Sequence, residues 1–103
     1  MIIVGNQRQL ANCIRNLRRI YECGYNHQSF DMIGLYIDLI TVLNRLNAGD
    51  RNIIIKRFLL EELPSEIAMH NHCSSANISQ KTSKAIKRFI DEYQRYYHVL
   101  LPL

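Results

Sequence analysis

Apolar residues in this chain recur at steps of three and four positions rather than in alternation, which predicts helices and no strands. The first such segment begins after Asn6, a residue suited to cap a helix, and continues to about Cys23. Gly24 follows, where a glycine commonly ends a helix. One stripe of this segment is apolar and is expected to face the core: Leu10, Ile14, Leu17 and Tyr21.

A second helix is predicted from a cap at Ser29 to about Leu46, and apolar residues occupy two of its sides. One stripe holds Ile33, Tyr36, Ile37, Ile40 and Leu43, and the other holds Met32, Leu35, Leu39, Val42 and Leu46. A helix that is apolar nearly all round is buried. In so short a chain it is either the centre of a bundle or part of a dimer interface, and the pattern leaves both open.

A third helix is predicted after the break Asn47-Ala48-Gly49, with Asp50 as its cap and its end at about Leu60. Its core positions follow the helical step: Ile53, Ile54 and Phe58. Pro64 suits the first turn of a short fourth helix, where its missing N–H is not needed. The core positions of that helix are Ile67 and Ala68.

After a turn over 71–74, Ser74 can cap a long fifth helix that reaches about His98. Its inward residues lie three or four apart: Ile78, Thr82, Ala85, Ile86, Phe89 and Tyr93. The chain therefore predicts one all-α domain of about five helices. A helical pair over 1–48 serves dimerisation or support, and a tri-helical unit with a long last helix occupies 49–103.

The positive charge of the chain is concentrated in its second half. The formal net charge is +4, with five Lys/Arg against four Asp/Glu in residues 1–50 and eight against five in residues 51–103. No acid lies between Glu66 and Asp91, whereas Lys81, Lys84 and Lys87 fall inside that gap. A concentrated basic helix suits a polyanion, although a solvated basic face is the alternative.

Small polar residues at the start of the fifth helix, with lysines further along, are typical of a helix-turn-helix unit whose last helix enters the major groove of DNA. Serine pairs with several base edges and glutamine pairs with adenine, while lysine suits phosphates. The expected base-reading residues lie on a recognition helix over about 75–90: Ser75, Ala76, Ser79, Gln80 and Ser83. The expected phosphate contacts are Lys56, Arg57, Ser65, Lys81, Lys84, Lys87 and Arg88.

A series of short motifs runs without a gap from Arg57 to Phe89. It comprises Arg57-Phe58, the turn Glu61-Glu62-Leu63, the motif Glu66-Ile67-Ala68, Cys73, the cap Ser74 and Ile78. This series resembles region four of the bacterial primary sigma factors. The resemblance implies base reading by Ser75, Ala76, Ser79 and Gln80, and backbone contact by Lys84. The chain departs from that family at Asn71, where Leu is usual, and at His72, where Gly is frequent.

The size and helical organisation resemble the small transcriptional regulators of phages and prophages, such as the ArpU and RinA families, and more weakly LuxR-type output domains. This resemblance implies a sequence-specific DNA-binding regulator in the cytoplasm of a bacterial host cell, with RNA polymerase as a further candidate partner. The two-sided second helix and the small footprint of one unit on DNA predict a homodimer. One alternative is an adaptor that binds RNA polymerase or a sigma factor through the sigma-like unit. Another is a DNA-binding component of phage packaging.

Other residue groups carry weaker signals. His70, His72 and Cys73 lack a second Cys/His pair nearby, so we expect no metal site and no other cofactor. Three cysteines without framework spacing favour a reduced protein, and no sequence feature indicates an enzyme, a signal peptide or a membrane segment. Four arginines lie off the apolar stripe of the first helix, and we expect them to form a solvated face: Arg8, Arg15, Arg18 and Arg19. The alternatives are contacts to flanking phosphates or to an acidic patch of a polymerase.

Overall fold

A computed structural model describes residues 4–103, so the first three residues of the predicted helical pair lie outside the described part. The described part contains helices and no strands, which confirms the predicted all-α fold. A π-helical turn, Ile55–Leu59, continues the α-helix Ala48–Ile54. The α-helices are α1 (Gln7–Arg15), α2 (Leu17–Tyr25), α3 (Phe30–Leu43), α4 (Ala48–Ile54), α5 (Pro64–His70) and α6 (Ser75–Tyr97).

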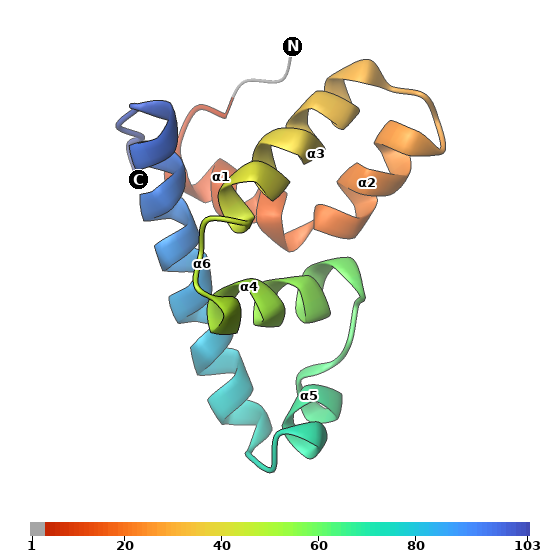
Figure 1. Cartoon of the computed structure of the whole chain (residues 1–103), viewed down its shortest axis with the longest axis vertical. Coiled ribbons are helices and arrows are strands. Elements are labelled where there is room, and N and C mark those ends of the chain that lie inside the picture. The colour runs from red at the N-terminus through yellow and green to blue at the C-terminus, as the bar shows by residue number, and fades with distance from the viewer. Residues whose placement is uncertain (1–3) are drawn as a thin grey trace.

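The long helix α6 joins the two halves of the molecule, as Figure 1 shows. Helices α1 and α3 pack beside its C-terminal part, α4 crosses its middle, and α5 lies beside its N-terminal end. Helices α2 and α3 form an antiparallel pair at the end away from α5. The start of α1 lies beside the C-terminal residues, because the Gln7 N–H donates a hydrogen bond to the Pro102 carbonyl at 2.7 Å.

A single apolar core runs through the molecule and draws on every α-helix. Most of the residues predicted to face inward from α6 are buried, and Ile90 joins them. Tyr93 is only partly buried. The one hydroxyl among the buried residues of α6 is satisfied, since Thr82 donates to the Ile78 carbonyl at 2.7 Å. The confirmed core residues of α6 are Ile78, Thr82, Ala85, Ile86 and Phe89.

The first predicted helix is in fact two helices. Asn6 caps α1, as predicted, by accepting a hydrogen bond from the Gln9 N–H at 2.8 Å. The helix breaks at Asn16, whose φ of −110° and ψ of 25° depart from helical values. The break turns the chain, so Ile20 is buried and Tyr21 is exposed, contrary to the prediction for Tyr21.

Gly24 lies inside α2 and not beyond its end, so its predicted role as a helix terminator is wrong. The residue is buried, and a Cβ atom there would come within 3.0 Å of the Ile33 backbone nitrogen. Glycine at this position therefore allows α2 and α3 to approach closely.

Helix α3 begins at its predicted cap, since the Ser29 hydroxyl accepts from the Met32 N–H at 3.4 Å. It ends at Leu43, three residues before the predicted Leu46. Of the two alternatives left open, α3 as the fully buried centre of the bundle is wrong, because Phe30 is 86% exposed and Ile37 is 51% exposed. The face that packs on α2 and α6 carries the buried side chains: Leu35, Leu39, Val42 and Leu43.

The cap of α4 is Asn47, and the prediction of Asp50 for this role is wrong. The Asn47 side chain accepts a hydrogen bond from the Asp50 N–H at 2.9 Å. Asp50 lies in the first helical turn, where a carboxylate is stabilised by the helix dipole, and it is buried. The predicted core residues that follow it are confirmed as buried: Ile53, Ile54 and Phe58.

Candidate nucleic-acid interface

Helices α5 and α6 form two consecutive, separately capped helices. The Glu66 carboxylate accepts from the Leu63 N–H at 3.0 Å and secures the start of α5, with Pro64 as its first residue. The Ser74 hydroxyl accepts from the Asn77 N–H at 3.1 Å and caps α6, as predicted. The predicted core residues of α5, Ile67 and Ala68, are buried, so the two helices are held together by apolar contact.

The turn between these helices depends on a left-handed residue. His72 has a φ of 54°, and the following Cys73 N–H donates to the Ala68 carbonyl at 3.0 Å. Glycine adopts this conformation without the steric cost that a Cβ atom brings. The preceding Asn71 side chain donates to the Ile67 carbonyl at 2.9 Å, so it caps the end of α5 and is exposed.

We expect His72→Gly to stabilise the protein by about 0.5–1 kcal/mol. Glycine removes the steric cost of the left-handed conformation, and its larger conformational entropy in the unfolded state offsets part of that gain. Urea unfolding followed by circular dichroism measures this change. The control is His70→Gly, which places glycine at the last residue of α5 and should lower stability by less than about 1 kcal/mol. Equal destabilisation by both substitutions would contradict this account of the turn.

The predicted base-reading residues share the exposed surface of α6. All five lie in its first nine residues and all are exposed. Within the described part of the chain, none of their side chains forms a hydrogen bond or an ion pair that would have to be broken. The hydroxyl and amide groups of Ser75, Ser79, Gln80 and Ser83 are therefore available to an external ligand, and Ala76 offers an exposed methyl group beside them.

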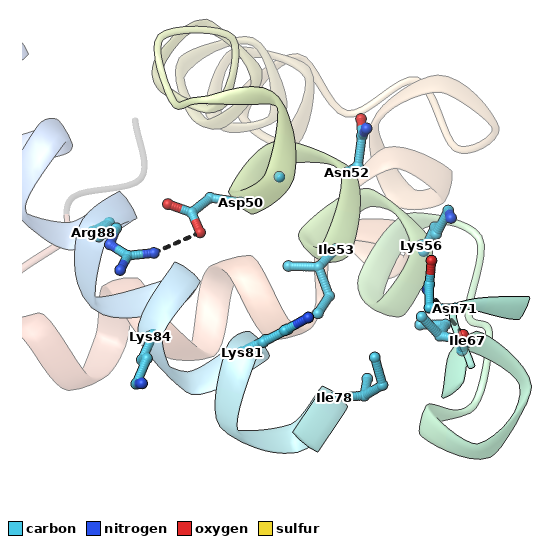
Figure 2. Close-up of a pocket in the computed structure, with 11 residues that line it drawn as sticks. Asp50, Asn52, Ile53, Lys56, Ile67, Asn71, Ile78, Lys81, Lys84 and Arg88 are labelled. Carbon is cyan, nitrogen blue, oxygen red and sulfur yellow. Dashed lines mark hydrogen bonds and ion pairs between the residues drawn. The ribbon is translucent and has the colours of Figure 1, made fainter. Parts of the chain in front are cut away.

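A groove of about 540 Å³ lies between α4, α5 and α6, and four of the predicted phosphate-binding residues line it. Lys56, in the π-helical turn, stands on the wall opposite α6 (Figure 2). Two asparagine amides, Asn52 and Asn71, line the same groove. The fold thus brings together cations that are up to 32 positions apart in the sequence: Lys56, Lys81, Lys84 and Arg88.

One acid lines this groove, and it is paired. Arg88 reaches from α6 toward α4, where its guanidinium nitrogen lies 2.8 Å from the Asp50 carboxylate (Figure 2). The other oxygen of Asp50 accepts from the Asn47 side-chain amide at 2.9 Å. Asp50 is only 7% exposed, and a buried carboxylate requires partners of this kind. Arg88 therefore ties α6 to α4 and is less free to bind phosphate than the lysines.

The remaining predicted phosphate contacts lie elsewhere. Ser65 and Lys87 are exposed outside the lining of this groove. Arg57 lines a different groove, where it donates to the Glu62 carbonyl at 2.9 Å. The Asp50–Arg88 pair was missed by the sequence reasoning, because no local pattern connects residues separated by 38 positions.

The tyrosines near the C-terminus have packing roles. Tyr93 and Tyr97 lie against the core, and Tyr97 donates to the Asp38 carboxylate at 3.2 Å. Burial and this neighbouring carboxylate raise the pKa of Tyr97 to about 12. The contact ties the end of α6 to α3.

Residues 4–103 contain neither a cluster of metal-binding side chains nor a membrane-spanning helix. No three His, Cys, Asp or Glu side chains gather there in a way that could hold a metal ion, and this includes the surroundings of His70, His72 and Cys73. No helix of that part is both long enough and apolar enough to cross a membrane. Comparisons of the chain with protein-family models, with curated proteins and with solved structures find no match.

Proposed function

We propose that this protein is a sequence-specific DNA-binding transcriptional regulator of the phage or prophage type, with α6 as its recognition helix. The observation that carries the proposal is the surface of α6. The exposed polar side chains at the start of α6 are unpaired and adjoin a groove lined by three lysines, and the first acidic residue of α6 itself is Asp91. Such a surface combines sequence reading with phosphate attraction.

In this account the first half of α6 lies in the major groove of DNA. Gln80 is placed to pair with an adenine edge, and the neighbouring serines adapt to several bases. Lys84 and Lys87 face the sugar-phosphate backbone, and Lys56 and Lys81 add positive charge from the α4–α6 groove. The sigma-like motifs quoted from the sequence support the same orientation, and they favour action in the cytoplasm of a bacterial host.

A selection of bound fragments from genomic DNA tests this function. We expect the wild-type protein to enrich fragments that share one short motif, because base contacts add specificity to phosphate binding. Recovery of fragments without a common motif, or failure to retain DNA at low salt, would contradict the proposal.

We also infer that the protein acts as a homodimer through the outward face of α3. Phe30 and Ile37 are exposed on that face, and one helix-turn-helix unit covers only a short DNA site. Sedimentation at micromolar concentration should then give twice the mass of the chain. The selected DNA motif should be an inverted repeat whose half-sites lie about 34 Å apart, or a multiple of that distance. A monomer at that concentration, or a single asymmetric half-site, would refute the dimer.

A further inference from the structure

A second groove lies between the α1–α2 corner and the π-helical turn, and arginine side chains line it. Its volume is about 410 Å³, and it shares no lining residue with the α4–α6 groove. Among residues 4–103, the only acid that lines it is Glu61. Its cations come from two separate parts of the sequence that the packing of α2 on the π-helical turn brings together: Arg15, Arg18, Arg19 and Arg57. We call these four residues and their surroundings the arginine groove.

The Phe58 ring orders two of these guanidinium groups. Arg57 lies 5.2 Å from the ring centre, and its guanidinium donates to the Glu62 carbonyl at 2.9 Å. Arg15 lies 5.9 Å from the centre of the same ring. Guanidinium groups favour such positions over aromatic faces, and a side chain that is already ordered loses less freedom when it binds an anion.

The other two arginines differ in their pairing. Arg18 pairs with Glu22 at 2.7 Å and donates to the Leu59 carbonyl at 3.3 Å, so it braces α2 against the π-helical turn. Arg19 is exposed, and neither it nor Arg15 or Arg57 forms an ion pair within residues 4–103. The arginine groove therefore has unpaired positive charge in a partly ordered arrangement.

The groove also has an apolar component. Leu63 lines it and is exposed, and the nearby Leu60 is exposed as well. In the α4–α6 groove the apolar lining residues, Ile53, Ile67 and Ile78, are buried, and lysines and asparagines lie beside them. Exposed leucines beside guanidinium groups suit a surface that offers both carboxylates and aliphatic side chains. They suit a DNA backbone less well, since its groups facing the protein are phosphates and sugars.

We propose that the arginine groove binds an acidic, leucine-containing segment of a partner protein. The carboxylates of that segment pair with Arg15, Arg19 and Arg57, and its aliphatic side chains pack on Leu60 and Leu63. This interaction goes beyond DNA binding and uses a separate surface, so the chain can hold DNA through α6 while it holds a protein through the corner of α1 and α2.

The test uses the full chain and a fluorescent helical peptide of about 16 residues made of Glu, Leu and Ala, with a twin in which Gln replaces every Glu. At physiological salt the wild-type protein should bind the Glu peptide at least about tenfold more tightly than the Gln twin. The double variant Arg15→Glu/Arg19→Glu should lose about tenfold or more of this affinity. The matched control Lys84→Glu/Lys87→Glu changes net charge equally and should retain it.

DNA binding by the same variants separates this proposal from the function proposed for α6. The arginine double variant should keep its affinity for DNA, and the lysine double variant should lose it. Loss of DNA binding by the arginine variant with no change in peptide binding would make the groove a DNA contact and overturn the proposal. Equal peptide loss in both variants, or no binding of the Glu peptide to the wild type, would also overturn it.

A folding defect in the charge-reversal variant is detectable as a lowered thermal midpoint. In that event Arg15→Gln/Arg19→Gln replaces it, since this change removes the charge and keeps most of the side chain. The neutral variant should lose peptide affinity in the same direction, by a smaller factor. Unchanged peptide affinity in a folded neutral variant would contradict the role of these two arginines.

Discussion

Replacing Gln80, Lys84 and Lys87 with alanine is expected to weaken binding to a selected DNA fragment by about a hundredfold or more. A bidentate contact between glutamine and adenine contributes about 1–3 kcal/mol of discrimination. Each lysine that is removed leaves one phosphate with its counterions, so fewer counterions are released on binding. All three side chains are exposed, and alanine has the highest helix propensity, so α6 should remain folded. Fluorescence anisotropy at constant salt measures the loss.

The control for this triple variant removes the same amount of charge from another surface. Arg8 and Arg19 are exposed on α1 and α2, away from the reading face of α6. Their replacement by alanine should change DNA affinity by no more than a few fold, because the lost attraction is only long-range and is screened by salt. If the triple variant binds DNA as tightly as the wild type, α6 is not the recognition helix.

Phe89→Ala is expected to lower the free energy of unfolding by about 3–5 kcal/mol, the usual cost when a fully buried phenylalanine leaves a cavity. Phe89 has no exposed surface and is the largest fully buried side chain in the described part of the protein. A domain of this size has only about 5–15 kcal/mol of stability. Chemical unfolding should therefore show that a large part of this stability is lost. The variant should also lose DNA binding at elevated temperature, where it unfolds.

Met69→Ala is the control for the core substitution, because Met69 is a large apolar residue that is 75% exposed on α5. Its replacement should change stability by no more than about 0.5 kcal/mol. A similar effect of both substitutions would mean that α6 is not packed in the core as described.

Features that depend on short stretches of sequence were predicted well. The caps at Asn6, Ser29 and Ser74 are formed by side chains that bond to backbone groups three residues away, so local sequence suffices to predict them. The apolar spacing of α6 likewise predicted its buried face, because one helix repeats its orientation regularly. The candidate reading face followed from the same spacing.

Features that depend on distant contacts were not predicted. The break at Asn16 arises where α1 packs on α6 and α2 packs on α3, and no proline or glycine marks it. Asp50 has the residue type of a cap, but Asn47 takes that role and Asp50 pairs with Arg88 instead. The arginine groove likewise joins residues about 40 positions apart. Such contacts are set by tertiary packing rather than by local propensity.

The salt dependence of DNA binding tests the central claim most directly. Four lysines are proposed as phosphate contacts: Lys56, Lys81, Lys84 and Lys87. A plot of the logarithm of the DNA-binding constant against the logarithm of the salt concentration should therefore have a slope of about −3 to −4 per bound chain. Removing Lys84 and Lys87 should make that slope shallower by about 2. A slope near zero, or the absence of binding to double-stranded DNA at low salt, would contradict the assignment of α6 as a DNA-binding helix.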